Sequence, residues 1–220
     1  MRFALTTTPD ARINAGTARQ SMTESQIQLN PAAFKGRIES GDTVHGIFAG
    51  LAAPMAAEVA AAAGVDFVLL DLEHGGGGEE QVGPTVIATG AYGVPTLVRV
   101  ETGDRIRIGR ALDAGASGIM VPRINSATEA AEAINHFHYP PVGDRGVASY
   151  NRAARWGMKP GALEPRQRST VIIQIETLGA LEEVELIAAI DGIDVLFVGP
   201  LDLSYALGVP RDFNAPVFGQ

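Results

Sequence analysis

The chain has 220 residues, of which 46% are hydrophobic and 19% charged, values typical of one ordinary globular domain. Its net charge of −8, with no basic cluster, argues against nucleic acid and anionic membranes as partners. The chain has no cysteine, which excludes a disulfide scaffold, a thiolate nucleophile and cysteine-ligated zinc or iron–sulfur centres. This composition suits a cytoplasmic enzyme.

The N-terminal residues 1–42 show no periodicity and are rich in Thr, Ala, Ser, Gln and Asn. They predict a largely disordered leader with a short helix around 32–40, and Met22 is an alternative start of translation. The leader lacks the apolar core of a secretory signal. The most apolar stretch, 52–70, carries two acidic residues and is broken by Gly64, so it predicts a helix and then a strand, not a membrane span.

Apolar runs alternate with helical patterns through the rest of the chain, which predicts a single α/β domain over residues 43–220. Strands are expected at 44–48, 66–72, 95–100, 118–122, 170–176 and 194–199. Helices are expected at 54–63, 79–90, 103–114, 126–137 and 177–190, with a last one starting near Leu203. The strands are continuous apolar runs, which indicates burial on both faces and therefore parallel pairing.

Six βα units fit either a doubly wound sheet or a (β/α)₈ TIM barrel. The barrel is favoured because polar residues fall at or just after the C-terminal ends of four different strands: Asp71, Glu73, His74, Arg99, Glu176 and Asp202. A doubly wound sheet would show a glycine fingerprint after its first strand, where this chain has AGLAAP. A complete barrel needs eight strands and ~250 residues, so the sequence predicts a C-terminally truncated barrel that lacks about two βα units.

Glu176 and Asp202 each follow a buried apolar strand, and two carboxylates at one rim are unfavourable unless a cation lies between them. Oxygen ligands favour Mg²⁺ or Mn²⁺, with Co²⁺ as a further option. Each acid alone is also a common residue at a helix start. Gln174 lies on the same strand face as Glu176, and the three residues together favour the metal site.

Arg99 ends an apolar strand, and a buried guanidinium needs an anion beside it. Its partner is either Asp71 or Glu73 in a structural ion pair, or a substrate carboxylate or developing enolate oxygen. The acidic rim favours the second alternative. His74 follows the preceding strand with Asp71 three residues away to orient its ring, a recurrent acid/base arrangement.

Two loops complete the pattern. GGGG at 75–78 lacks the spacing of a P-loop and predicts a mobile loop whose backbone can approach a ligand or a neighbour. The long segment 139–157 carries Arg145, Arg152, Arg155 and the only Trp. It predicts a lid, a substrate-contacting loop or an oligomer contact.

Several motif blocks resemble the HpcH/HpaI aldolase family, the metal-dependent class II pyruvate aldolases of the phosphoenolpyruvate/pyruvate superfamily. They occur in family order: FVLLDLEH (67–74), LVRV (97–100), RALDAGASGIMVP (110–122), YPPVGDRG (139–146), RAARWG (152–157), VIIQIET (171–177) and GPLDLS (199–204). The resemblance implies a (β/α)₈ barrel, a divalent metal and a homo-oligomer, either a hexamer or a trimer.

The resemblance also implies roles for single residues. Glu176 and Asp202 would hold the metal, Arg99 would stabilise the enolate oxygen, and His74 with Asp71 would transfer protons. The remaining residues would bind substrate: Gln174 beside the metal, and the backbone around Gly199, Pro200, Leu201 and Asp202 at the pyruvate carboxylate. The chain departs from the family at Leu201, where Ala is frequent, and in the EHGGGG segment.

The expected reaction is reversible cleavage of a 4-hydroxy-2-oxo acid into pyruvate, or a related 2-oxo acid, and an aldehyde, in aromatic or sugar-acid catabolism. The only lysines, Lys35 and Lys159, are not at strand ends, which disfavours a Schiff-base mechanism. One alternative is a lyase similar to the citryl- and malyl-CoA lyases. The other is an inactive fragment whose open barrel exposes two strand edges.

Overall fold

The computed structural model describes residues 31–158 and 161–219, so most of the predicted leader lies outside the described residues. Six parallel strands form one sheet in sequential order. The strands are β1 (Gly46–Ala49), β2 (Phe67–Asp71), β3 (Thr96–Arg99), β4 (Gly118–Val121), β5 (Thr170–Ile175) and β6 (Val195–Val198). The sheet is the half-barrel that the sequence predicts, a partial TIM barrel.

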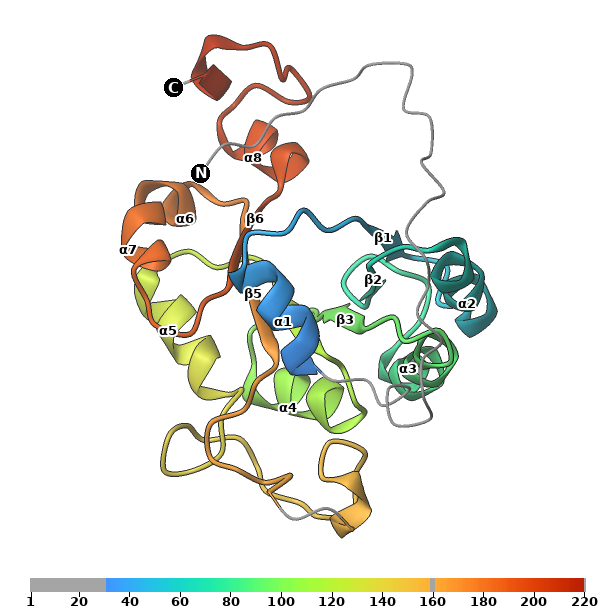
Figure 1. Ribbon diagram of the computed structural model, residues 1–220. Coiled ribbons are helices and arrows are strands. Elements are labelled where there is room, and N and C mark those ends of the chain that lie inside the picture. The colour runs from blue at the N-terminus through green and yellow to red at the C-terminus, as the bar shows by residue number, and fades with distance from the viewer. Residues whose placement is uncertain (1–30, 159–160, 220) are drawn as a thin grey trace.

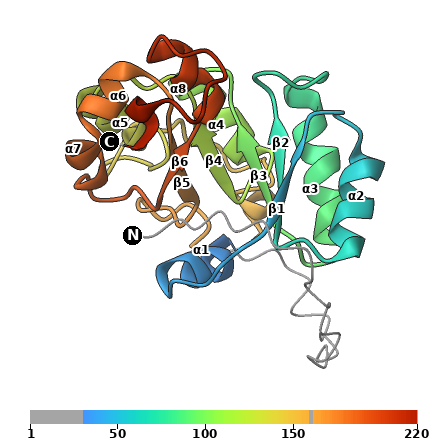
Figure 2. The same cartoon turned by 90° about the horizontal axis from the view of Figure 1, so that it is seen from above.

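Helices lie around the outside of the curled sheet, with α2 beside α3 at one flank and α5 to α7 at the other (Figure 1, Figure 2). The helices are α1 (Pro31–Glu39), α2 (Pro54–Ala63), α3 (Val82–Gly90), α4 (Arg105–Asp113), α5 (Ala127–Asn135), α6 (Leu178–Glu182), α7 (Val184–Ala188) and α8 (Pro200–Ala206). Short 3₁₀ turns occur at η2 (Glu79–Gln81), η3 (Arg155–Gly157) and η4 (Pro216–Gly219). Among the described residues, no helix is long and apolar enough to cross a membrane.

One predicted helix, at 177–190, is wrong as a single element because α6 and α7 are separated at Glu183. The backbone of Glu183 leaves the helical region, with φ −104° and ψ 16°. Its carboxylate accepts a hydrogen bond of 2.7 Å from the amide of Ala127 at the start of α5. This long-range contact satisfies a helix N-terminus that has no i−4 acceptor of its own.

Side chains alternate between the two faces of the sheet, which gives the half-barrel an inner and an outer core. The outer face packs against the helices through residues such as Leu70, Val98, Ile119 and Ile173. The inner face carries a separate apolar layer that contains Leu69, Leu97, Met120 and Ile172. Two residues further along their strands, the same face becomes polar, with Asp71, Arg99 and Gln174.

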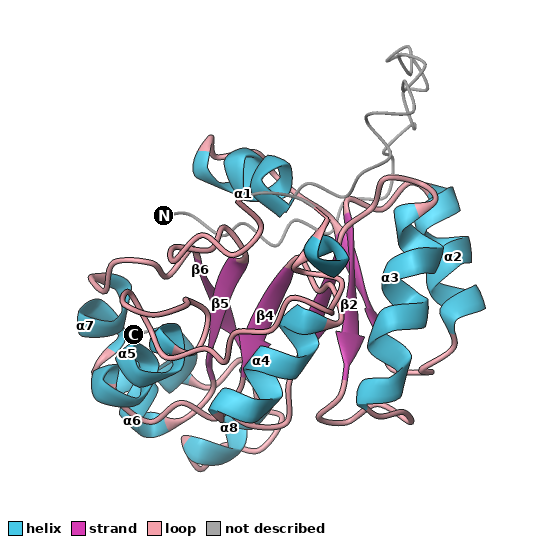
Figure 3. Cartoon of the chain, turned by 90° about the horizontal axis from the view of Figure 1, so that it is seen from below, coloured by secondary structure: helices cyan, strands magenta, loops and turns pink. Residues whose placement is uncertain are grey.

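Helix α1 closes the N-terminal end of this inner core. Phe34 is buried in the inner apolar layer. Lys35 forms an ion pair of 2.9 Å with Asp194, and Arg37 forms one of 2.9 Å with Asp66. Both aspartates come just before a strand, so α1 lies where the strand arrows begin, whereas α8 lies beyond the arrowheads (Figure 3).

The segment between α5 and β5 meets α1: His138, Arg166 and Gln167 line one surface depression with Ala32, Lys35 and Glu39 of that helix. A helix-to-strand connection in a parallel sheet must return to the N-terminal strand edge. Arg145, almost fully buried, binds Asp113 at the end of α4 at 2.5 Å and stacks over Tyr139 at 4.7 Å. The prediction that 139–157 forms a lid over this chain's own rim is therefore wrong.

Strands β1 and β6 are the two edges of the sheet. Their outer-face side chains Ile47 and Val198 are 45% and 50% exposed. On the inner face, Phe48 of β1 meets Phe197 of β6 with ring centroids 5.7 Å apart. Because these strands stand at opposite ends of the sheet order, the contact shows how strongly the sheet curls.

Candidate active site at the C-terminal rim

The first half of the rim is an ion-pair network around Arg99. Strand register pairs Asp71 directly with Arg99. The guanidinium donates to both Asp71 oxygens at 2.9 and 2.7 Å, and its third nitrogen lies 3.1 Å from Glu73 Oε2. Arg99 therefore contacts both of the carboxylates, Asp71 and Glu73, that the sequence offers as its ion-pair partners. They fix the guanidinium at the rim, where the ring of Phe48 also packs 5.3 Å from it.

Asp71 is a buried anion that its neighbours keep charged. Burial raises the pKa of its carboxyl group, but the hydrogen bonds from Arg99 and from the backbone amides of His74 and Glu73 outweigh that effect. The net pKa of Asp71 is therefore below its usual value. The amide contacts measure 3.2 Å from His74 and 3.1 Å from Glu73. Asp71 thus acts as the anchor that holds Arg99 and the turn after β2.

His74 lies at the rim, but with a different neighbour from the one predicted. Its side chain is 67% exposed, and Nε2 lies 3.9 Å from Glu73 Oε1. The predicted orientation of the ring by Asp71 is not observed, because the planar fork of Arg99 takes both Asp71 oxygens. The carboxylate of Glu73, and not that of Asp71, therefore lies within ion-pair distance of the imidazole.

The second half of the rim is built around Glu176, which follows β5 and is 2% exposed. Gln174 Nε2 donates to Glu176 Oε2, and the Arg123 amide donates to Oε1 at 2.8 Å. Burial raises the pKa of Glu176; the Arg123 amide opposes this shift, while the charges of Asp202 and Glu73 add to it. The hydrogen-bond donors are neutral amides, and the charges of Arg123 and Arg99 do not offset the effect of burial, so a cation beside this carboxylate would be stabilised.

Asp202 lies in the first turn of α8 with its side chain 43% exposed and Oδ1 3.9 Å from Arg123 Nη1. Gly199 allows this segment to pack tightly on Glu176. A Cβ at Gly199 would lie 2.9 Å from Glu176 Cβ and 3.1 Å from Gln174 Nε2. A glycine is therefore needed for the close approach of the β6–α8 turn to β5.

The donors at this rim fit a hard divalent cation. The carboxylates of Glu176 and Asp202 interact electrostatically, and the buried Gln174 Oε1 has no hydrogen-bond partner. Across residues 31–158 and 161–219, no group of three or more His, Asp or Glu side chains is arranged to hold a metal. The candidate set thus has two carboxylates, which would leave most of an octahedral shell for water and a chelating ligand.

Two further features of the rim concern the backbone. Arg123, which the sequence reasoning missed, follows β4 with a left-handed φ of 58°; its signal was a cation at a strand end, as for Arg99. The glycine loop after β2 packs closely, but on the chain's own backbone. Gly76 donates to the Gly50 carbonyl at 2.9 Å, and a Cβ at Gly75 would clash with the Asp71 carbonyl.

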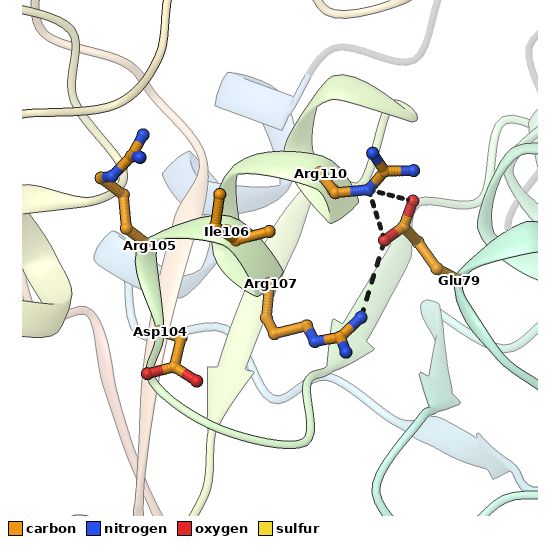
Figure 4. Close-up of a pocket in the computed structure, with 6 residues that line it drawn as sticks. All are labelled: Glu79, Asp104, Arg105, Ile106, Arg107 and Arg110. Carbon is orange, nitrogen blue, oxygen red and sulfur yellow. Dashed lines mark hydrogen bonds and ion pairs between the residues drawn. The ribbon is translucent and has the colours of Figure 1, made fainter.

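A surface depression of about 700 Å³ lies apart from the rim at the start of α4 (Figure 4). It is lined by Glu79, Asp104, Arg105, Ile106, Arg107 and Arg110. Arg110 Nε lies 2.6 Å from both oxygens of Glu79, and Arg107 Nη1 lies 3.9 Å from one of them (Figure 4). Glu79 partly neutralises these two arginines, and we assign the depression no ligand.

A parallel half-barrel with charged side chains collected at the C-terminal strand ends defines a protein of the TIM-barrel class, in which the site stands at that rim. Residues 45–216 match the family model described as HpcH/HpaI aldolase/citrate lyase. The chain belongs to the HpcH/HpaI aldolase/citrate lyase family. The resemblance seen in the motif blocks is thereby confirmed.

Individual relatives agree with this assignment. The chain is 38% identical over 191 residues to a pyruvate aldolase of Rhizobium etli, covering 86% of this chain and 75% of the relative. It is 36% identical to a 2-keto-3-deoxy-L-rhamnonate aldolase of Klebsiella pneumoniae, covering 83% and 69%. A solved family structure from Burkholderia cenocepacia superposes with TM-score 0.80 at 37% identity, covering 86% and 76%. These two sequence relatives are aldolases, which are carbon–carbon lyases.

Proposed function

We propose that this chain is a divalent-metal-dependent aldolase that reversibly cleaves a 4-hydroxy-2-oxo acid into pyruvate, or a related 2-oxo acid, and an aldehyde. The observation that carries the proposal is Glu176, a buried carboxylate with raised pKa beside Asp202, held only by neutral donors. The family and the activities named for the two aldolase relatives support the same reaction class.

Glu176 and Asp202 would hold Mg²⁺ or Mn²⁺, with Co²⁺ as a further option. When bound, such an ion acts as a Lewis acid that polarises the 2-oxo group. Gln174 contributes by orienting Glu176 through its amide nitrogen, while its free carbonyl oxygen is available to accept a hydrogen bond from water or substrate. The backbone of the turn Gly199–Pro200–Leu201–Asp202 would bind the carboxylate of the 2-oxo acid.

Arg99 would stabilise the negative charge that develops on the 2-oxo oxygen as the bond between C3 and C4 breaks. Asp71 and Glu73 hold its guanidinium in place before substrate arrives, so little reorganisation is needed during reaction. Such preorganised donors are typically worth about 10²-fold or more in turnover.

His74 would accept the proton of the 4-hydroxyl group, directly or through a water molecule, as the aldehyde carbonyl forms. Its ring is exposed at the rim, where Nε2 lies 3.9 Å from Glu73 Oε1. C3 of the enolate, which becomes the methyl group of pyruvate, would then take up a proton from water, and His74 would return its proton to solvent. Asp71 contributes through Arg99 and through the amide of His74.

The test measures pyruvate release from a 4-hydroxy-2-oxo acid with and without EDTA. EDTA and Glu176→Gln should each abolish release, and Arg99→Ala should lower turnover about 10²-fold or more. A melt gives an independent readout, since Mg²⁺ at 100 times its Kd should stabilise the fold by about 2.7 kcal/mol. Activity that survives both EDTA and Glu176→Gln would refute the metal role.

The family description also includes citrate lyase, so a carbon–carbon lyase acting on a CoA thioester is the second candidate. The same rim would serve both reactions, and substrate choice separates them. The rate of acetyl-CoA release from citryl-CoA or malyl-CoA is compared with the rate of pyruvate release from a 4-hydroxy-2-oxo acid. A faster release of acetyl-CoA would favour the lyase.

A further inference from the structure

Arg123 is the charged residue of the rim that the proposed reaction leaves unused. It follows β4, its amide donates to Glu176, and its backbone adopts the left-handed conformation. Asn125 Nδ2 donates to the Arg123 carbonyl at 2.9 Å, and Thr177 Oγ1 donates to the Ile124 carbonyl at 2.7 Å. A strained backbone that persists because its surroundings impose it often marks a functional position.

The side chain of Arg123 is held far more loosely than that of Arg99. It is 61% exposed, and its contact with Asp202 measures 3.9 Å. Arg99 has a side chain 10% exposed, with carboxylate contacts of 2.7 and 3.1 Å. One guanidinium is therefore fixed at the strand ends, while the other reaches into solvent above the candidate metal ligands.

A cation between Glu176 and Asp202 changes the balance around Arg123. A cation held by Glu176 and Asp202 would neutralise Asp202, and Arg123, now 3.9 Å from that carboxylate, would then be able to bind another anion. A substrate held at Glu176 and Asp202 would place its far end within reach of this exposed side chain, which lies next to Asp202.

We propose that Arg123 forms a subsite for a carboxylate at the end of the substrate remote from the 2-oxo group. The chain would then prefer 4-hydroxy-2-oxo acids whose aldehyde half carries a negative charge. The proposal rests on the aldolase function above and adds the substrate class. A planar guanidinium binds a carboxylate through two parallel hydrogen bonds, so the subsite selects charge and geometry together.

The first test compares glyoxylate with glycolaldehyde, two aldehydes of equal length, as acceptors for pyruvate with Mg²⁺ present. The measured quantity is the ratio of their kcat/KM values. Arg123→Gln should lower the glyoxylate-to-glycolaldehyde ratio by about 10-fold or more. Arg123→Lys should retain part of the ratio because it keeps the charge, and Arg105→Gln, an exposed arginine of α4, should leave it unchanged.

The second test measures binding without turnover, by calorimetry of 2-oxoglutarate and 2-oxopentanoate on the Mg²⁺-loaded chain. Arg123 should make 2-oxoglutarate the tighter ligand, and Arg123→Gln should remove that difference. If Arg123→Gln weakens the binding of both 2-oxo acids equally, or lowers kcat/KM equally for both aldehydes, then Arg123 acts at the carboxylate of the 2-oxo acid. Either result would overturn the proposed subsite. Absence of 2-oxopentanoate binding to the wild-type chain would refute the aldolase proposal itself, and the subsite with it.

Discussion

At the scale of single residues, the rim contrasts two buried carboxylates that differ in their neighbours. Asp71 receives a bidentate guanidinium and two amides, and its pKa falls below the usual value. Glu176 receives hydrogen bonds from amides alone, and its burial, together with the charges of Asp202 and Glu73, raises its pKa against the opposing effect of Arg123. A carboxylate therefore serves as a structural anchor at β2, whereas the carboxylate after β5 has no bidentate guanidinium partner and is the one beside which we propose that a cation binds.

The raised pKa of Glu176 predicts how stability changes with pH. Its ionisation in the folded chain is unfavourable, so stability is lost as pH rises from the unfolded pKa through the folded one. Without metal, Glu176→Gln should therefore melt at a higher temperature than the wild type near pH 7.5, with little difference near pH 4. Melts in EDTA at both pH values check this, and an equal difference at the two pH values would contradict it.

Gly199 gives a second residue-scale prediction. Gly199→Ala should displace Glu176 or Gln174, because the new Cβ would approach both side chains to about 3 Å. We expect a loss of about 1–3 kcal/mol in unfolding free energy and weaker Mg²⁺-dependent stabilisation. Gly109→Ala is the matched control: its Cβ would meet nothing within 4 Å, and alanine favours α4 by up to about 1 kcal/mol. Denaturant titrations measure the unfolding free energy of both variants, and a loss in Gly199→Ala no larger than in Gly109→Ala would contradict the prediction.

At the scale of elements, the half-barrel has two chemically different ends. Helix α1 and the long α5–β5 connection occupy the N-terminal end through buried and paired residues such as Phe34 and Arg145. The connections that follow the strands carry the charged rim. Stability and candidate chemistry are therefore separated along the strand axis, as in other barrels of this class.

Helix α1 should contribute strongly to folding stability. Phe34→Ala removes a ring from the inner core and should cost about 3–5 kcal/mol in unfolding free energy. Met55→Ala, at a side chain 76% exposed on α2, should change it by less than about 0.5 kcal/mol. Urea titration followed by circular dichroism measures both. A Phe34→Ala effect as small as that of Met55→Ala would show that α1 does not cover the core in solution.

At the scale of the whole molecule, the sheet curls until Phe48 and Phe197 touch, yet β1 and β6 keep exposed apolar side chains. Apolar strand edges pair readily with other chains, so we expect self-association. The size of the assembly, hexamer or trimer by the family resemblance, stays a prediction.

Single charges at the edges should test this expectation. Ile47→Lys and Val198→Lys should each lower the mass seen by light scattering at high concentration, because a lysine at an edge opposes pairing. Ile106→Lys, a similarly exposed site on α4, serves as the control and should leave the mass unchanged. If the edge variants associate as strongly as the wild type, another surface must hold the copies together.

The sequence by itself determined the six strands, their parallel pairing and the edge at which the charged residues gather. Local periodicity carries that information, because apolar runs specify buried strands and the residues after them must stand at one rim. The motif blocks likewise determined the family. Boundaries moved by a few residues where caps intervened, and the break at Glu183 had no local signal.

Only the tertiary structure decided which rim side chains meet. Strand register sets Asp71 against Arg99, so Asp71 binds the guanidinium and the His74 backbone amide and does not orient the His74 ring. The left-handed turn at Arg123 aims an amide at Glu176, and the topology carries the 139–157 segment to the far end. These contacts join residues distant in the chain, so their geometry depends on register, twist and packing, which no local pattern encodes.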